Sequence, residues 1–316
     1  MTDEPKERHL YPPHVFAGNP LDRGEVERRD EDWIDAQARD PRSLYLPFSS
    51  LNVLLGIDPE PTLGWLPQDV IPADGTVSTP TLLGMMDGST HFAIEVDDDA
   101  AVFLEEWSGM KFEDCRAAGE LLPIPDGGIV AQARAQIDWH RRHRYCSVCG
   151  NPSEKRRGGQ VRFCPVCKAQ HFPRTDPVVI TVVEDKEGDR CLLGQSRGRL
   201  QRMRMYSALA GFMDQGEAIE EAVAREIREE AGIEVKNVRY HSSQPWPFPS
   251  SLMIGCIAEA ATTDINMDAE EMTDVQWFER SEVLLALEGK SEKLTVPAPL
   301  AIAHHLVKAW AYGEMP

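Results

Sequence analysis

Apolar residues recur at near three-four spacing in residues 217–231, and this pattern predicts an amphipathic helix of about four turns. Its core-facing positions are Ile219, Ala222, Val223, Ile227 and Ala231. Gly211 fits a turn ahead of this helix, and Gly232 fits its C-terminal stop. Glu226, Glu229 and Glu230 stand at i, i+3 and i+4, so the helix should crowd three carboxylates onto one patch.

Other segments carry their own periodicity. The β-branched run 177–184 predicts a buried strand with 191–196 as its partner, and 237–241 and 252–260 predict two further strands. Helices are predicted in 131–143 and 299–312. Between residues 44 and 122, short apolar segments alternate with Pro, Gly and Asp clusters, which indicates an α+β domain after a loosely ordered or partly helical lead-in. We therefore expect an N-terminal α+β domain in 1–140, a small module in 141–172 and a C-terminal domain in 173–316.

Composition narrows the class of protein. Hydrophobic residues make up 42% and charged residues 27% of the 316 positions, which are ordinary globular values. A net charge of −19 opposes strong non-specific binding to nucleic acid or to an anionic membrane. Neither a signal-peptide pattern nor an apolar run of about 18 residues occurs. We expect a cytoplasmic protein with no membrane partner.

Four of the seven cysteines form a spaced set. Cys146, Cys149, Cys164 and Cys167 give Cys-x2-Cys-x14-Cys-x2-Cys, which predicts a closed, structural Zn²⁺ site in a zinc ribbon. Residues 141–174 hold nine Lys or Arg and one acid, Glu154. This basic ribbon raises an alternative, a zinc-ribbon protein that binds nucleic acid. The same charges could also offset the acidic domains or line a dimer contact.

The glutamates of the predicted helix suggest a second metal site. Like charges at i, i+3 and i+4 cost a few tenths of a kcal/mol per pair, and a hard divalent cation would reverse that sign. Carboxylate oxygens suit Mg²⁺ or Mn²⁺. The alternative is an acidic solvated helix face in a chain with 52 Asp and Glu. Arg225, one turn before Glu229, could orient the carboxylates or form an ordinary i,i+4 surface pair.

Residues 211–233 match Gly-x5-Glu-x7-Arg-Glu-apolar-x-Glu-Glu-x-Gly-apolar without exception, and this pattern resembles the Nudix box. The resemblance implies a Nudix α/β/α sandwich with a mixed sheet that hydrolyses a nucleoside diphosphate linked to another moiety. It implies catalytic roles for Glu226, Glu229, Glu230 and Arg225. The metal ligands that it implies are Ala210, Glu226, Glu229, Glu230 and Glu271. The choice of Glu271 over the adjacent Glu270 rests on its spacing from Trp277.

Residues 243–251, SQPWPFPSS, alternate prolines with two aromatic rings. The prolines should hold the segment extended, with Trp246 and Phe248 as stacking surfaces for flat rings. The alternative is a proline-rich surface loop. Together with the ribbon and the Nudix box, this segment resembles the NADH pyrophosphatases. That resemblance implies substrate contacts from Gln244, Pro245, Trp246, Pro247, Phe248, Pro249, Ser250, Ser251, Phe172, Ala303 and Arg116. Phe172 stands where the family often has Tyr, so one hydroxyl is missing.

The resemblance implies hydrolysis of NADH or NAD⁺ to nicotinamide mononucleotide and AMP with Mg²⁺ or Mn²⁺, by a homodimer. Removal of NAD caps from RNA 5′ ends is a further expectation. ADP-ribose and dinucleoside polyphosphates stay open as alternative substrates, and the zinc-ribbon nucleic-acid-binding protein stays open as an alternative class.

Overall fold

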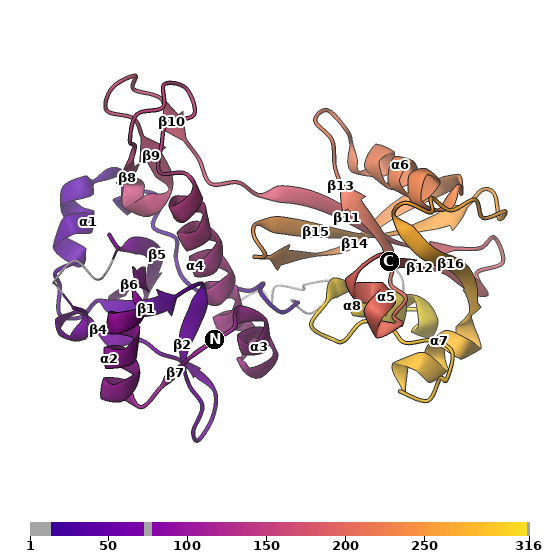
Figure 1. Ribbon diagram of the computed structural model, residues 1–316, viewed down its shortest axis with the longest axis horizontal. Coiled ribbons are helices and arrows are strands. Elements are labelled where there is room, and N and C mark those ends of the chain that lie inside the picture. The colour runs from indigo at the N-terminus through magenta and orange to yellow at the C-terminus, as the bar shows by residue number, and fades with distance from the viewer. Residues whose placement is uncertain (1–13, 73–77, 315–316) are drawn as a thin grey trace, which may run out of the picture. The chain divides into compact units, whose positions relative to one another are not determined.

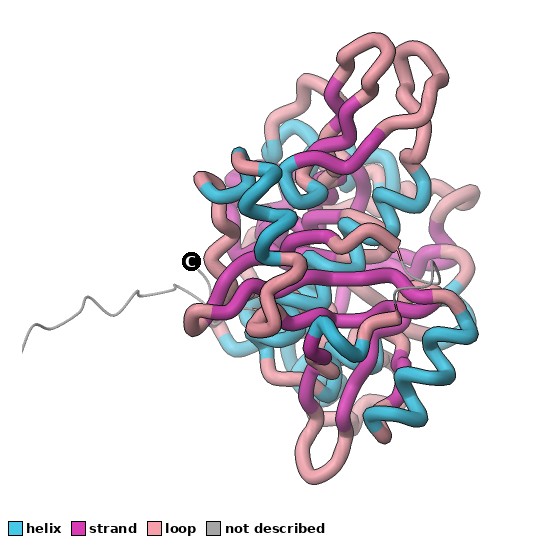
Figure 2. The backbone as a smooth tube through the Cα atoms, turned by 90° about the vertical axis from the view of Figure 1, so that its left-hand side faces the viewer, coloured by secondary structure: helices cyan, strands magenta, loops and turns pink. Residues whose placement is uncertain are grey.

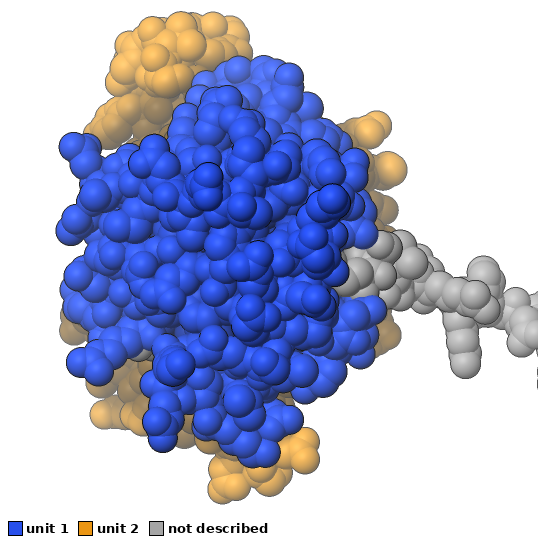
Figure 3. Space-filling view, turned by 90° about the vertical axis from the view of Figure 1, so that its right-hand side faces the viewer, with its two compact units in different colours: residues 1–14, 176–244, 251–316 blue, residues 15–175, 245–250 orange. Residues whose placement is uncertain are grey.

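The computed structural model of the chain describes residues 14–72 and 78–314. The chain forms two compact units, which Figure 3 colours separately. Of the described residues, the first unit contains residue 14 together with 176–244 and 251–314, and the second contains 15–72, 78–175 and 245–250. The hexapeptide 245–250 thus belongs to the second unit, although the residues on either side of it belong to the first.

A seven-stranded sheet organises most of the second unit, with strand order β3-β2-β1-β6-β5, while β4 pairs with β1 and β7 with β2. Strands β1 and β6 pair in parallel, whereas β1 with β2 and β4, β2 with β3 and β7, and β5 with β6 pair antiparallel. The strands are β1 (Leu44–Ser49), β2 (Asn52–Gly56), β3 (Thr62–Leu63), β4 (Leu66–Pro67), β5 (Thr81–Met86), β6 (Ser89–Val96) and β7 (Lys111–Glu113). The helices are η1 (Glu27–Arg29), α1 (Glu31–Gln37), η2 (Gln68–Val70), α2 (Asp98–Ser108), α3 (Cys115–Leu121) and α4 (Ile124–Arg142).

Both faces of this sheet are buried, because alternate residues of a strand point to opposite sides. Leu46 packs in one core with Ile129 and Ile137 of α4. Its neighbour Tyr45 packs in the other core with Leu104 of α2. The α+β class predicted for this region is confirmed.

Helix α4 begins at Ile124, seven residues before the predicted start. The sequence Pro-Asp-Gly-Gly at residues 125–128 looks like a helix breaker. The structure shows why a glycine is needed inside this helix: a Cβ on Gly128 would lie 2.6 Å from the backbone nitrogen of Asn19. The helix therefore approaches the backbone of residues 17–19 more closely than a side chain would permit.

The ribbon follows α4 with a three-stranded antiparallel sheet of order β10-β9-β8. Its elements are β8 (Glu154–Arg156), η3 (Arg157–Gly159), β9 (Val161–Phe163) and β10 (Gln170–His171).

The first unit contains a six-stranded mixed sheet of order β14-β15-β11-β12-β16, with β13 paired to β11. Strands β11 and β15 are parallel, whereas β12 and β13 run antiparallel to β11. The strands are β11 (Asp176–Glu184), β12 (Arg190–Ser196), β13 (Leu209–Phe212), β14 (Val235–Trp246), β15 (Ser251–Ala260) and β16 (Met272–Glu279), and the helices are α5 (Arg199–Met203), α6 (Ile219–Ala231), α7 (Arg280–Leu287) and α8 (Ile302–Tyr312).

Helix α6 covers one face of this sheet, and α7 and α8 lie on the other (Figure 1). Val183 faces the α6 core with Val223 and Ile227, while Val182 faces the α8 core with Leu306 and Trp310. The predicted sandwich with a mixed sheet is confirmed. Figure 2 colours the helices and strands along the backbone of the chain. Among the described residues, no helix is long and apolar enough to cross a membrane.

Candidate active site

Helix α6 begins at Ile219, two residues later than predicted, and ends at Ala231, with Gly232 as its C-cap. The backbone N–H of Ala218 donates to a carboxylate oxygen of Glu221 at 2.8 Å, which satisfies one donor at the start of the helix. Glu217, predicted as the first helical residue, lies ahead of it instead. Its carboxylate accepts a hydrogen bond from the Asp214 N–H at 2.8 Å and is bound by Arg225.

Arg225 joins several carboxylates rather than one. Its guanidinium binds both oxygens of Glu217, at 2.6 and 2.8 Å, and donates to Glu226 at 2.8 Å and to Glu229 at 2.9 Å. It also donates to the carbonyl oxygen of Phe212 at 2.9 Å. These hydrogen bonds lower the pKa of Glu217 to about 2. Arg225 therefore bonds three carboxylates, where an ordinary i,i+4 surface pair joins one. These bonds fix the positions of the Glu226 and Glu229 carboxylates.

The three helix glutamates differ in exposure. The Glu229 side chain is 52% exposed, Glu226 is 13% exposed, and Glu230 as a residue is only 7% exposed. Burial raises the pKa of Glu230 to about 8, and the charges of Glu226 and Glu271 add to this effect. Within the described residues, Glu230 Oε2 is buried and has no hydrogen-bond partner. A solvated acidic face therefore does not describe this residue.

Strand β13 reaches the same carboxylates, and Gly211 lies within it rather than in the predicted turn. A Cβ on Gly211 would lie 2.0 Å from the carboxyl carbon of Glu226. A side chain at this position would therefore have to displace the Glu226 carboxylate, which is the end of a flexible side chain. The preceding residue, Ala210, forms a backbone hydrogen bond with Glu230 that opposes the rise in its pKa.

Glu271 lies in the loop ahead of β16 and is exposed. Its charge raises the pKa of both Glu226 and Glu230, so its carboxylate faces the same site. This effect supports the choice of Glu271 over Glu270. A buried carboxylate oxygen without a partner, together with neighbouring acids, fits a hard divalent cation.

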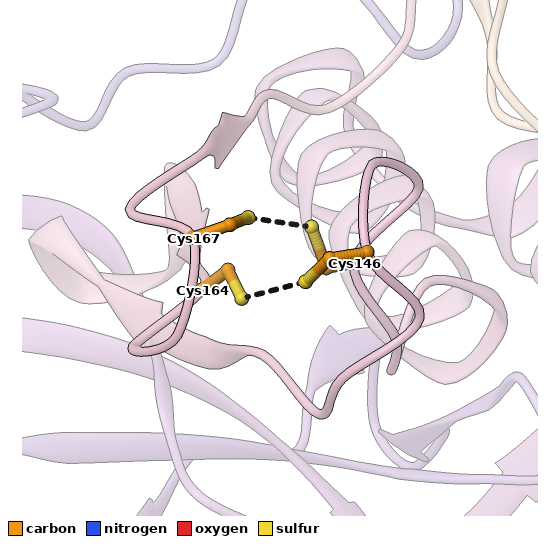
Figure 4. A group of neighbouring side chains, drawn as sticks. Cys146, Cys164 and Cys167 are labelled. Carbon is orange, nitrogen blue, oxygen red and sulfur yellow. Dashed lines mark hydrogen bonds between the residues drawn. The ribbon is translucent and has the colours of Figure 1, made fainter.

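The four cysteines form a compact set in the ribbon. Among the described residues, only Cys146, Cys149, Cys164 and Cys167 bring three or more ligand atoms of His, Cys, Asp or Glu within 4.8 Å of one another. The sulfurs face each other in two pairs at 3.5 Å, Cys146 with Cys167 and Cys149 with Cys164 (Figure 4). The donor set fits the predicted structural Zn²⁺.

The two cysteine turns share a hydrogen-bond pattern. Gly150 N–H donates to the Cys146 carbonyl at 2.9 Å, and Lys168 N–H donates to the Cys164 carbonyl at 3.0 Å. Both Gly150 and Lys168 have positive φ, 74° and 65°. The second turn therefore places a non-glycine residue, Lys168, in the left-handed region.

The SQPWPFPSS segment is extended only as far as Trp246, where β14 ends, and residues 247–250 form a turn. The prediction of one extended segment was wrong for this part. Gln244 is fully buried, and its amide joins the Leu300 carbonyl and the Ile302 N–H, each at 2.8 Å. In the rest of the segment, Pro247 is buried and Pro249 is exposed. The other residues are half-buried: Pro245, Ser250 and Ser251.

The aromatic rings of this segment pack within the second unit. The Phe248 ring lies 3.8 Å from the Arg116 guanidinium and 4.5 Å from that of Arg134. Arg134 also donates a hydrogen bond to the Pro247 carbonyl. Trp246 and Phe248 both make edge contacts with Phe16, at 6.0 and 5.7 Å between ring centroids.

The other predicted contact residues occupy different environments. Phe172, just after β10, is 60% exposed, and Ala303 in α8 is buried in the core. Arg116 lies in the first turn of α3. Sequence reasoning did not identify Arg134, because nothing local indicates a contact with a segment more than 110 residues away.

Three family models match the chain. Residues 42–139 match an NADH pyrophosphatase-like rudimentary NUDIX domain, residues 141–172 an NADH pyrophosphatase zinc ribbon domain, and residues 174–297 a NUDIX domain. The N-terminal α+β region is thus similar to a rudimentary NUDIX domain.

The chain is 36% identical over 352 residues to the NAD-capped RNA hydrolase NUDT12 of Macaca fascicularis, covering 98% of this chain and 75% of that protein. It is 42% identical over 219 residues to the mitochondrial NAD(P)H pyrophosphatase NUDT13 of Mus musculus, covering 66% and 61%. It is 38% identical over 208 residues to the NAD-capped RNA hydrolase NudC of Mycobacterium bovis, covering 64% and 66%. With these matches and the glutamates of α6, the chain belongs to the Nudix hydrolases, in the NADH pyrophosphatase family that joins a rudimentary NUDIX domain, a zinc ribbon and a NUDIX domain.

Proposed function

We propose that the chain hydrolyses the pyrophosphate of NADH or NAD⁺ to give nicotinamide mononucleotide and AMP. The observation that carries the proposal is Glu230, a buried carboxylate with an oxygen that has no partner among the described residues, beside Glu226 and Glu271. The names of the relatives, NAD(P)H pyrophosphatase and NAD-capped RNA hydrolase, support an NAD-containing substrate.

Glu226, Glu229, Glu230, Glu271 and the carbonyl of Ala210 are the groups proposed to hold Mg²⁺ or Mn²⁺. When bound, such a cation polarises the pyrophosphate, neutralises developing charge and lowers the pKa of a bound water. The chain's own contribution is positioning. Arg225 holds the Glu226 and Glu229 carboxylates at 2.8 and 2.9 Å. Arg225 is anchored in turn by Glu217, so the carboxylates are oriented before substrate arrives.

The four thiolates are proposed to bind zinc in a structural role, because a closed Cys₄ set leaves no position for water. In the SQPWPFPSS segment, we assign base stacking to Trp246 rather than Phe248. The Phe248 ring already carries two guanidinium groups within 4.5 Å of its centroid, which leaves less of its face for a nucleotide base. Contacts from Gln244, Phe172, Ala303 and Arg116 stay proposals from the family resemblance.

The test is turnover of NADH, NAD⁺, ADP-ribose and a diadenosine polyphosphate with Mg²⁺ or Mn²⁺, with products separated by chromatography. Preferential release of AMP and reduced nicotinamide mononucleotide from NADH is the expected result. Faster turnover of ADP-ribose or the polyphosphate would leave the Nudix chemistry standing and refute the substrate assignment. Glu230→Gln should abolish hydrolysis. If the chain only bound nucleic acid, the same substitution would leave that binding unchanged.

RNA carrying NAD at its 5′ end is the second candidate substrate, supported by the names of two relatives. The ribbon offers less free charge than its sequence indicates. Arg156 pairs with Glu154 at 2.9 Å, and Arg157 pairs with Glu25 at 2.7 Å. If the ribbon binds RNA, Arg156→Ala with Arg157→Ala should abolish salt-sensitive RNA binding. Unchanged affinity in the double variant would exclude these two arginines as the contact.

A homodimer and a cytoplasmic location stay proposals from the sequence. Sedimentation equilibrium tests the first. Localisation of the tagged chain tests the second, and the relatives' names include mitochondrial and chloroplastic proteins.

A further inference from the structure

A cavity of about 480 Å³ lies within the second unit, and none of its lining residues belongs to helix α6. It is bordered by the C-terminal end of α4, by Glu95 of β6 and by strands β8 and β9 of the ribbon. Four cationic side chains line it, Arg141, Arg144, Lys155 and Arg162. Only two carboxylates do so, those of Glu95 and Glu154.

Both carboxylates already have partners. Glu95 pairs with Arg141 at 3.2 Å, and Glu154 pairs at 2.9 Å with Arg156, which is outside the cavity lining. Arg144, Lys155 and Arg162 form no ion pair with any carboxylate in the part of the chain that the structure describes. The charge of Glu95 also acts on Lys155 and Arg144, so this one carboxylate faces several cations and the cavity keeps an excess of positive charge.

The hydrogen bonds of these cations are made to neutral groups. Lys155 Nζ donates to the Thr79 carbonyl at 2.6 Å and to Thr81 Oγ1 at 3.1 Å. Arg162 is only 8% exposed and donates to Ser153 Oγ at 2.8 Å and to the Ser153 carbonyl at 2.5 Å. Neutral acceptors satisfy the N–H groups but leave the charge in place, and a buried charge without a counter-ion is costly.

The electrostatics of Lys155 agree with this description. Burial and the nearby charge of Arg162 lower the pKa of Lys155 to about 8, and the charge of Glu95 only partly opposes this effect. His140 also lines the cavity but adds no positive charge near neutral pH. Burial lowers its pKa to about 3, and it hydrogen-bonds the Gly159 carbonyl at 2.9 Å.

We propose that this cavity binds a small molecule that carries a phosphate monoester, of the size of a nucleoside monophosphate. The volume lies in the range of small-molecule sites, roughly 300–1,000 Å³, and exceeds what a phosphate ion alone requires. A phosphoryl dianion would add counter-charge beyond the single carboxylate of Glu95, which faces Arg141, Arg144 and Lys155. Ile137 offers an apolar wall, and Ser78 and Thr79 offer polar groups for the remainder of the ligand. This inference does not depend on the proposed hydrolase activity.

The experiment is calorimetric titration of AMP into the full, zinc-containing chain without added Mg²⁺ or Mn²⁺, with adenosine and inorganic phosphate as comparison ligands. AMP should bind, inorganic phosphate should compete with it, and adenosine should not bind. Arg144→Gln should weaken AMP binding at least tenfold. The Arg144 guanidinium has no hydrogen-bond or ion-pair partner among the described residues, so this change should leave the fold intact.

Arg142→Gln is the matched control, because Arg142 is an exposed neighbour that pairs with Asp138 and does not line the cavity. It should leave the affinity unchanged. Glu95→Gln removes a negative charge from the cavity and should tighten AMP binding several-fold. Binding of AMP weaker than about 1 mM would overturn the proposal. So would affinity that survives Arg144→Gln, or affinity that is lost in Glu230→Gln, since the latter would place AMP at the α6 carboxylates.

Discussion

Replacing Gly211 by alanine tests whether β13 must leave room for the Glu226 carboxylate. A Cβ on Gly211 would lie 2.0 Å from the carboxyl carbon of Glu226 and 2.1 and 2.2 Å from its oxygens. Ordinary contacts to a Cβ begin at 3.4 Å, so the carboxylate must retreat by about 1.4 Å, the difference between 3.4 and 2.0 Å. That shift would break the 2.8 Å hydrogen bond between Arg225 and Glu226.

A displacement of about 1 Å in a catalytic site costs roughly 10²-fold in rate. We therefore expect kcat for NADH hydrolysis to fall about hundredfold, which corresponds to about 2.7 kcal/mol in the activation free energy. The free energy of unfolding should change little, because the displaced atoms are the far end of the flexible Glu226 side chain. The chain should still fold, because the displaced group is a side chain at the edge of the site.

The assay is kcat at saturating NADH and Mg²⁺ or Mn²⁺, with thermal unfolding followed by circular dichroism. Gly127→Ala is the control. Gly127 lies in helix α4, and the nearest atom to its Cβ would be 3.4 Å away, an ordinary contact. This control should retain full kcat and gain up to about 1 kcal/mol of stability. A folded Gly211→Ala variant with kcat within twofold of the parent would refute the reasoning, because Glu226 would then not need its observed position.

Three further predictions concern Glu230, the cysteines of the ribbon and the buried His140. Glu230 has a pKa raised to about 8, so without added Mg²⁺ or Mn²⁺ its ionisation destabilises the fold increasingly from about pH 4.5 up to pH 8. Glu230→Gln should therefore raise the melting temperature relative to the parent by a margin that widens from pH 5 to pH 8; a margin independent of pH would contradict this. Cys164→Ser should release the zinc and unfold the ribbon, as measured by atomic absorption and near-ultraviolet circular dichroism, and purified parent protein without zinc would argue against the site. His140 stays neutral in the fold down to about pH 3, whereas the unfolded chain takes up a proton below about pH 6.5. In urea unfolding, the parent should therefore lose about 1 kcal/mol more stability between pH 7 and 5.5 than His140→Gln loses. Identical pH dependence in both proteins would contradict the burial of a neutral His140.

Sequence alone predicted the features that depend on short-range geometry. The helix face with Glu226, Glu229 and Glu230 follows from residues three and four apart, and the cysteine turns follow from the Cys-x2-Cys spacing. The strand at 177–184 and its partner follow from β-branched runs bounded by turn residues. In each case the relevant neighbours lie within one turn or one hairpin, so the chain order nearly determines the contacts.

Tertiary structure decided which of those charges are buried and what they face. Three glutamates look alike on the helix, yet only Glu230 is buried, because the sheet beneath α6 excludes water from that position and not from Glu229. The lack of room for a side chain at Gly211 comes from a strand that approaches the helix carboxylates. The stacking of Arg134 on Phe248, and the cavity lined by residues from 78 to 162, join segments that are far apart in the chain. Burial, pKa and long-range contacts are properties of how elements pack, and the spacing of residues along the chain does not specify them.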